Sequence, residues 1–311
     1  MASMSEQTPN VDVRMRGFHE RVTVDVALQW VDENANPLPA VAIPLLEAGG
    51  RVLSESISSQ VDVPGFARSM MDGFAVLAND TLGASSYNPL QLSIVGESLP
   101  GSPHAQETGP LSSGQAVRIM TGAPIPDGAD AVLPVEKTEQ RGNESIVALD
   151  AVAPGKNVGQ RGEDIQVGKP LLPAGRRLRP QDIGVLSSVG ASELHVVASP
   201  RVRIVVPGNE LLPPGSQPRG NQIVDANSPM LANLIRRDGG TAINPGIVPD
   251  NPESILAALN SDADVVLVSG GSSVGQEDHA PVLVAQHGNL AIHGIAMRPS
   301  SPAGMGSLQH R

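Results

Sequence analysis

The stretch V-V-L-V-S-G-G-S-S-V-G, residues 265–275, decides the fold class of the second half of the chain. Its first four residues are all apolar, as in strands of parallel sheets, which are covered on both faces. A glycine-rich loop follows, and a helix is predicted at 280–286. Because ligands of open α/β sheets bind outside the carboxyl ends of strands, this loop is a candidate phosphate or oxyanion site. A glycine-rich turn that binds no ligand explains the sequence of this loop equally well. The loop matches neither the P-loop spacing nor the full dinucleotide-binding fingerprint.

Strands and helices alternate on both sides of this stretch from residue 201 onward. The apolar run 202–206 predicts a buried strand, and a further strand is expected near Ala291. Asn227 and Asn251 each precede a helical spacing of apolar residues, which predicts two helices. Parallel strands joined by helices need right-handed crossovers, so we predict a parallel α/β domain.

The region from 60 to 149 has a different pattern of short apolar runs, which is typical of a small β domain. Short apolar runs at 73–76, 92–95, 116–120 and 131–135 are separated by Gly, Pro, Asn and Asp. No long helical pattern interrupts them.

The remaining elements flank this β region. Helical spacing of Val24, Ala27, Leu28 and Val31 predicts a helix with Thr23 as its N-cap. We expect, in addition, a short helix at 44–48 with Pro44 in its first position, a strand at 51–57, a helix from Pro180 to about Gly190 and a strand at 193–197.

Composition excludes several classes of protein. The 311 residues contain no cysteine, which excludes disulfides, thiolate catalysis and Cys-ligated zinc. The formal net charge of -11 and the lack of a basic block argue against nucleic-acid binding. No secretory signal or membrane-spanning run is visible, so we expect a soluble, cytoplasmic protein.

The local setting of the polar candidates leaves their roles open. The residues around Asp72 predict a turn before a strand, and those around Thr121 predict another turn. Asn227 is the expected cap of its helix. Asp225 and Asp250 could jointly hold a divalent ion through oxygen ligands, although spacing alone makes this the weaker interpretation.

Six motifs in one order give these candidates a common context. Together they resemble the molybdopterin molybdenumtransferase family, which includes the bacterial MoeA proteins and the gephyrin E domain. The resemblance runs from about residue 20 to the end of the sequence. The motifs are D-V-P-G-F-A-R-S-M-M-D-G-F-A-V (62–76), R-I-M-T-G-A-P-I-P-D-G-A-D-A-V (118–132), R-G-E-D-I (161–165), I-V-D-A-N-S (223–228), S-G-G-S-S-V-G (269–275) and A-M-R-P-S-S-P (296–302).

The resemblance implies a multidomain α+β and α/β architecture. It predicts an elongated, discontinuous α/β linker domain (20–57 plus 155–199) with an inserted small β domain (58–154). A parallel-sheet, molybdopterin-binding α/β domain (200–311) follows. Relative to the family, this last domain is expected to be incomplete, and the family's C-terminal β domain to be absent.

The implied reaction inserts molybdate into adenylylated molybdopterin and releases AMP, with Mg²⁺ assisting. The dithiolene supplies the sulfur ligands of the metal, so a chain without cysteine fits this chemistry. The family is typically dimeric, with an active site shared between subunits. We therefore expect a homodimer, with the molybdopterin adenylyltransferase as a further partner, and neither nucleic acid nor a membrane.

The resemblance also assigns roles to individual residues. The implied catalytic residues are Asp72, Thr121 and Arg298. The implied metal ligands are Glu163, Asp225 and Asp250. The cofactor-binding residues are Glu210 and five residues of the glycine-rich loop, namely Gly270, Gly271, Ser272, Ser273 and Gly275.

Three departures from the family pattern keep two other functions open. Residues 299–302 read P-S-S-P where the family has a lysine, residue 209 is Asn where the family usually has Asp, and the sequence stops shortly after A-G-M-G. One alternative is an impaired or inactive relative that binds molybdopterin or dimerises without turnover. The other is an adenylyltransferase-like nucleotide binder built on the α/β domain alone.

Overall fold

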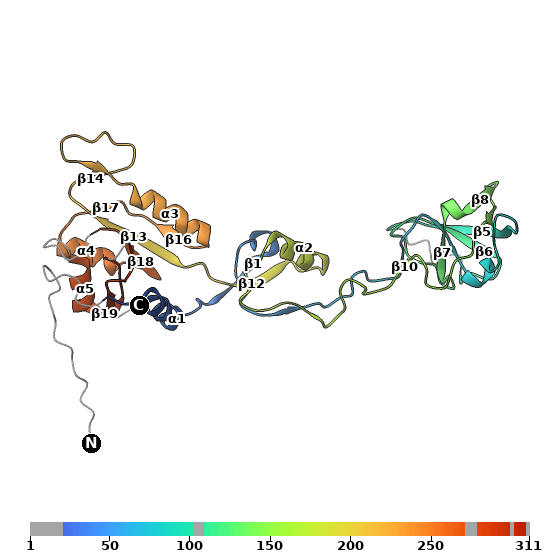
Figure 1. Cartoon of the computed structure of the whole chain (residues 1–311), viewed down its shortest axis with the longest axis horizontal. Coiled ribbons are helices and arrows are strands. Elements are labelled where there is room, and N and C mark those ends of the chain that lie inside the picture. Colours follow the sequence, from blue (N-terminus) through green and yellow to red (C-terminus); the bar gives the residue numbers. More distant parts are fainter. Residues whose placement is uncertain (1–20, 102–108, 271–278, 299–301, 309–311) are drawn as a thin grey trace, which may run out of the picture. The chain divides into compact units, whose positions relative to one another are not determined.

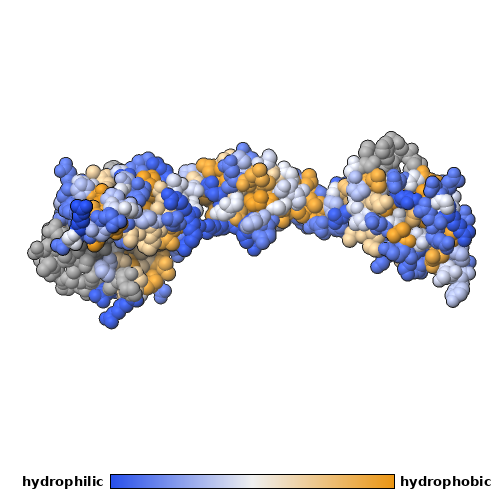
Figure 2. Space-filling view, turned by 90° about the horizontal axis from the view of Figure 1, so that it is seen from above, coloured by the Kyte–Doolittle hydropathy of each residue, from blue (hydrophilic) through white to orange (hydrophobic). Residues whose placement is uncertain are grey.

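The computed structural model describes residues 21–101, 109–270, 279–298 and 302–308. The chain divides into two compact units. Their helices and strands are labelled in Figure 1. The parallel-sheet unit consists of Met1–Ala42, Gly50–Val52 and His195–Arg311, and the six-stranded unit of Ile43–Gly49 and Leu53–Leu194. On the face seen in Figure 2, hydrophilic and apolar residues are interspersed over both units. Within the described residues, no helix is long and apolar enough to span a bilayer.

The six-stranded unit is built on one sheet with the strand order β7-β4-β6-β5-β9-β8. The pair β5–β6 is parallel, and the other neighbouring pairs are antiparallel. The four predicted strands of the β region are all present. The strands are β4 (Gly73–Val76), β5 (Leu90–Ser98), β6 (Gln115–Ile119), β7 (Ala131–Pro134), β8 (Thr138–Arg141) and β9 (Ser145–Ala148), with 3-10 turns η2 (Ala78–Thr81) and η4 (Val135–Lys137).

Strand β4 is the centre of this unit, because it is buried along its whole length. Phe74 and Val76 pack into a core on one face of the sheet, and Ala75 packs into a second core on the other. Gly73 lies where β7 approaches most closely. A Cβ at this position would be 2.1 Å from the Leu133 carbonyl oxygen, so only glycine fits.

Smaller elements complete the six-stranded unit. Strand β2 (Ile57–Ser58) pairs with β11 (Pro170–Leu172), and β3 (Arg68–Ser69) pairs with β10 (Val158–Gly159). Helix α2 (Pro180–Ser188) begins after Arg179, as predicted, and Asp182 accepts a hydrogen bond from the Arg179 backbone N–H at 2.9 Å. Strands β1 (Ala40–Pro44) and β12 (Glu193–Val197) form a two-stranded sheet, and the boundary of the two units passes through both strands.

The parallel-sheet unit is centred on β13 (Arg201–Pro207). This strand pairs in parallel with β16 (Thr241–Ile243), β17 (Ile247–Val248) and β18 (Val265–Val268), which confirms the predicted parallel sheet. Its two faces are covered by α3 (Asn227–Asp238) on one side and α4 (Pro252–Leu259) with α5 (His279–His287) on the other (Figure 1). A short parallel pair, β14 (Leu211–Leu212) and β15 (Ile223–Val224), follows β13.

The N-terminal helix joins the last part of the chain in this unit. Helix α1 (Val24–Asn34) begins at Thr23, whose hydroxyl accepts a hydrogen bond from Val26 N–H, and the predicted N-cap is thereby confirmed. Ala27 packs with Ile292 and Ile295, which lie in and just after β19 (Gly288–His293). The hairpin partner of β19 is β20 (Gly304–Leu308). Val22 N–H donates to Gly294 O at 3.1 Å, which ties the helix to this region.

Two predicted elements are wrong. The strand at 51–57 is replaced by short bridged residues and β2, because the backbone partners change within one residue. Val52 O accepts from Val197 N–H, whereas Leu53 bonds with residues 175–176, so no continuous ladder forms. The helix at 44–48 is a 3-10 turn, η1 (Leu45–Glu47). Pro44 precedes it with ψ of 142°, which is extended rather than helical.

The close approach at Gly73 yields a stability prediction. Gly73→Ala should destabilise the six-stranded unit by roughly 3 kcal/mol, because its Cβ would overlap backbone atoms that cannot move aside. The matched control is Gly184→Ala in the interior of α2, where a Cβ meets nothing within 4 Å. That variant should gain about 0.5–1 kcal/mol. Urea-induced unfolding measures both, and a Gly73→Ala variant as stable as the wild type would contradict the close approach.

Candidate functional site

Asp72 and Thr121 form the centre of the first candidate site. In the antiparallel pair β4–β6, Gly73 lies opposite Ile119, so residues just before β4 meet residues just after β6. Asp72 Oδ1 accepts hydrogen bonds from the Thr121 backbone N–H at 2.7 Å and from the Thr121 hydroxyl at 2.8 Å. The structure therefore brings together two of the three predicted catalytic residues.

The Asp72 carboxylate is exposed but held in its ionised form. The Thr121 backbone N–H, and after it the Thr121 hydroxyl, lower the pKa of Asp72 below its ordinary value of 3.8, because both groups bind the charged form. The backbone is fixed as well, since Val135 N–H donates to Asp72 O at 3.0 Å. Asp72 can therefore accept a proton or a hydrogen bond at neutral pH, but it has no proton to donate.

Three of the six motifs lie side by side around this pair. The Asp62 carboxylate binds Arg161 Nε at 2.7 Å, and Val63 bridges to Ile165. Ser69 N–H donates to Ala123 O at 2.9 Å. The motifs at 62–76, 118–132 and 161–165 are thereby joined by side-chain and backbone contacts, although as many as 103 positions separate their residues in the sequence.

Glu163 is engaged with Arg68, which our sequence analysis did not single out. Arg68 Nη2 lies 2.9 Å from Glu163 Oε1, and Gln160 N–H donates to Glu163 Oε2 at 3.0 Å. Arg68 first, and then the Gln160 amide, lower the pKa of the Glu163 carboxyl. Arg68 lies in the same motif as Asp72, and its charge is opposite to that of Glu163. This opposite charge is the feature of the sequence that could have predicted the contact.

The carboxylates do not form a recognisable metal centre on their own. Within the described residues, no group of three or more His, Asp or Glu side chains is placed to hold a metal ion. Glu163 is satisfied by Arg68 and Gln160, and Asp225 by two backbone amides. The described residues of this chain therefore do not by themselves define a magnesium site.

The second candidate site lies at the carboxyl ends of the parallel strands. Asn209 and Glu210 follow β13 and are exposed. Asn209 Oδ1 accepts a hydrogen bond from Asp250 N–H at 3.2 Å, and Glu210 O accepts one from Ile223 N–H at 3.0 Å. The structure therefore brings the segment that contains Glu210 to the segment that contains Asp250.

Asp225, rather than Asn227, binds the free amides at the start of helix α3, whose N-cap position is Ala226. Asp225 is 5% exposed, and its Oδ1 accepts hydrogen bonds from Asn227 N–H and Ser228 N–H, both at 3.0 Å. The expected cap at Asn227 is therefore wrong, because the carboxylate two positions earlier reaches the free amides first. The Asn227 side chain instead donates to Ser269 Oγ at 2.8 Å, at the start of the glycine-rich loop.

The rest of the predicted site falls partly outside the described residues. Gly270 has a φ of 101° and lies beside β13, with its Cβ position 3.5 Å from Pro207 O. Arg298 is exposed and comes shortly after β19. The remaining cofactor-binding residues of the prediction lie outside the described residues, namely Gly271, Ser272, Ser273 and Gly275.

Comparisons with known proteins identify the class of fold and site. Residues 22–190 match the family model "MoeA N-terminal region (domain I and II)", and residues 203–311 match "Probable molybdopterin binding domain". The molybdopterin biosynthesis moeA protein of Pyrococcus horikoshii is 33% identical, with a TM-score of 0.79 over 92% of this chain and 72% of that structure. The fold is therefore a MoeA-like fold with α/β content.

Similar curated proteins identify the family to which the chain belongs. The molybdopterin molybdenumtransferase 2 of Mycobacterium tuberculosis is 34% identical over 278 residues, or 86% of this chain and 67% of the relative. The molybdopterin molybdenumtransferase of Haemophilus influenzae is 34% identical over 88% of this chain and 67% of its own length. The chain thus spans about two thirds of these relatives, and it belongs to the MoeA family of molybdopterin molybdenumtransferases.

The Asp72–Thr121 contact predicts a change in the pKa of Asp72. Thr121→Ala should raise this pKa only part of the way towards 3.8, because the backbone N–H, the larger cause of the lowering, remains. Since the pKa of Asp72 is lowered by folding, its contribution to stability is present above pH 3.8 and is lost as the pH falls through the folded value. Carbon-detected NMR titration measures the pKa, and an unchanged value in Thr121→Ala would show that the hydroxyl bond is absent.

The Asp225 cap gives a second prediction for this site. Asp225→Ala should destabilise the parallel-sheet unit by about 1–2 kcal/mol, because two amides at the start of α3 lose their acceptor. Asp225→Ser should recover most of that loss, since serine is also a good N-cap. Thermal unfolding compares the two variants. If both are equally destabilised, capping is not the role of Asp225.

Proposed function

We propose that the chain inserts molybdate into adenylylated molybdopterin, with release of AMP, as a molybdopterin molybdenumtransferase. The observation that carries the proposal is the gathering of three family motifs around the Asp72–Thr121 pair, in a chain about 34% identical to curated enzymes of this name.

The atoms of the proposed reaction balance without a change in oxidation state. Two dithiolene sulfurs form bonds to molybdenum while one molybdenum–oxygen bond breaks, and the two thiol protons leave with that oxygen as water. Hydrolysis of the phosphoanhydride consumes one water and gives AMP and the molybdopterin phosphate. Protons must therefore move next to the metal during insertion.

We assign this proton handling to Asp72. Asp72 is ionised at neutral pH and can accept a hydrogen bond from a thiol and pass its proton to the departing oxygen in one step, since its lowered pKa makes it too weak a base to hold that proton. An ionised carboxylate repels an unprotonated molybdate oxygen, so Asp72 is a base and not the molybdate ligand. Arg298, a cation in a matching family position, is the proposed anion ligand.

The substrate's phosphate and nucleotide groups are assigned to the ends of the parallel strands. The loop that begins at Ser269 and Gly270 follows β18, where open α/β sheets bind ligands. Asn227 fixes the start of this loop through its bond to Ser269, and Glu210 lies at the adjacent end of β13. Backbone amides can bind the anions here although the chain has a net charge of -11.

The assembly and domain boundaries are part of the same proposal. The proposed domains are a discontinuous domain of residues 20–57 and 155–199, an inserted β domain of residues 58–154, and an α/β domain of residues 200–311. A homodimer is supported by three exposed apolar residues in the Asp72 motif, since exposed apolar groups beside a site mark interaction surfaces: Phe66, Met70 and Met71 are 48%, 49% and 39% exposed. Assistance by Mg²⁺ and supply of substrate by an adenylyltransferase stay predictions from the resemblance.

The role of Asp72 can be tested against a matched carboxylate. Asp72→Ala should reduce molybdenum insertion at least about 100-fold, the usual scale of a lost proton-transfer group. Asp80→Ala is the control, because Asp80 also accepts bonds from a hydroxyl and a backbone amide, at 2.7 Å from Ser113 and 2.8 Å from Gly114. Both variants should lose similar stability, and only Asp72→Ala should lose activity per folded molecule. Equal activities per folded molecule would make Asp72 a turn residue.

Rescue of a strain that lacks molybdenum insertase tests the function itself. The wild-type chain should restore the activity of a molybdoenzyme in that strain, and Asp72→Ala should not. No rescue by the wild type, with molybdopterin binding retained, would support the inactive relative. Binding of the nucleotide alone would support the adenylyltransferase-like alternative.

A further inference from the structure

An open pocket of about 340 Å³ lies in the parallel-sheet unit, and none of its lining residues is one that the proposed function assigns. Arg203 of β13 lines it, together with the segment 245–249 and one side of helix α4 and its C-terminal end. From that helix and its end come Ser254, Ala257, Ala258 and Ser261.

Arg203 is an unusual residue for this place in the fold. Side chains two apart in a strand share a face, and Val205 packs into the core beneath α4 and α5. Arg203 therefore lies on the helix-covered face of a parallel sheet, where apolar residues are the rule. Its Nε is buried and has no hydrogen-bond partner among the described residues. A buried donor of a charged group without a partner is costly, so an acceptor that reached this nitrogen would stabilise it.

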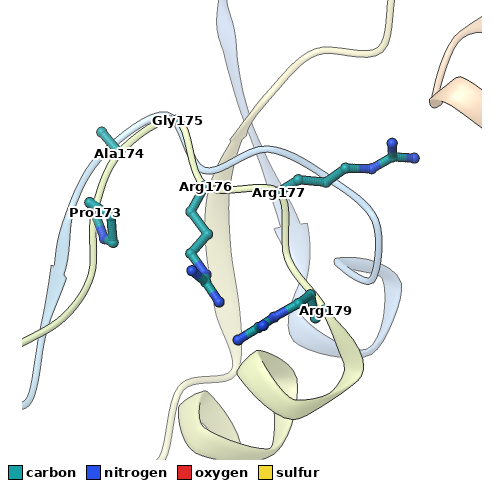
Figure 3. A pocket seen from close by; sticks show the side chains of 6 residues that line it. All are labelled: Pro173, Ala174, Gly175, Arg176, Arg177 and Arg179. Carbon is teal, nitrogen blue, oxygen red and sulfur yellow. The ribbon is translucent and has the colours of Figure 1, made fainter.

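Several other arginines of the protein form ion pairs within the chain. Arg201, two positions earlier in β13, forms an ion pair with Asp262. The pocket in Figure 3 is lined by three arginines, and Arg176 and Arg179 extend towards one another while Arg177 points away. Asp182 accepts hydrogen bonds from Arg176 and Arg179, so each of these two guanidiniums has an acceptor within the chain.

We propose that the Arg203 pocket binds a small molecule that has a carboxylate and a compact apolar body. The planar guanidinium suits a carboxylate, and the Ser254 hydroxyl lies on the same lining. The Ser261 hydroxyl donates to Ala257 O, which leaves Ser254 as the side-chain donor from α4. Pro245, Ile247 and Ala257 supply apolar walls. One cation matches one carboxylate, whereas a phosphate dianion would keep an excess negative charge in an acidic protein.

Binding is tested on the whole chain with benzoate and with inorganic phosphate at equal ionic strength. The Arg203 Nε–H resonance in a ¹⁵N NMR titration reports the contact directly. Benzoate should shift this resonance in a saturable way and raise the unfolding temperature, and phosphate should do neither. Saturable binding of phosphate in preference to benzoate, or no shift with either anion, would overturn the proposal.

Substitutions locate the site. Arg203→Met keeps the length of the side chain and should weaken benzoate binding about tenfold or more, the value of a charge-assisted hydrogen bond. Without ligand it should be at least as stable as the wild type, because the buried Nε–H loses no partner. The control Arg236→Met removes an exposed charge from α3, on the other face of the sheet, and should bind benzoate normally.

A second variant keeps the test decisive if Arg203→Met fails to fold. Ser254→Ala should fold normally and weaken benzoate binding severalfold, because one donor is lost. Unchanged affinity in Ser254→Ala, or a loss of affinity in Arg236→Met, would each contradict the site as described.

Discussion

Burial of a central strand on both faces is the constraint on which each unit depends. Strand β4 separates two cores in one unit, and β13 separates two cores in the other. Because neither strand has a free face, its register and ends are fixed by packing. The candidate functional residues lie just outside these ends: Asp72 precedes β4, and Asn209 and Glu210 follow β13. Rigid strands thus position exposed polar groups that the loops alone could not hold in place.

The carboxylates show how an acidic protein prepares for anionic substrates. Asp72 and Asp225 each bind two donors from nearby residues, and Glu163 binds Arg68 and an amide. Each of these negative charges is therefore partly neutralised where it stands. Under the proposed function, the donors towards an oxyanion come from the backbone of loops and from exposed arginines such as Arg298, so a net charge of -11 does not exclude anionic ligands.

Strands with continuous apolar runs, such as 73–76 and 265–268, could be predicted because burial on both faces leaves a direct trace in composition. Short or exposed strands left no such trace, and β8, β14 and β15 were not anticipated. The prediction of a strand at 51–57 was wrong because alternation of apolar and polar residues cannot reveal a change of backbone hydrogen-bond partner. The Asp72–Thr121 contact joins residues 49 positions apart and depends on the β4–β6 register. Sequence motifs could place both residues in one site only through the resemblance to a family.

Helix α1 has a consequence for how the chain is made. The helix is synthesised well before its packing partners Ile292 and Ile295, which come about 270 residues later. At roughly 5–20 residues per second, tens of seconds pass before they leave the ribosome. The six-stranded unit uses residues up to 194 and can complete its sheet during this interval. The side of α1 that carries Ala27 therefore stays without its packing partners until nearly all of the described chain has been made.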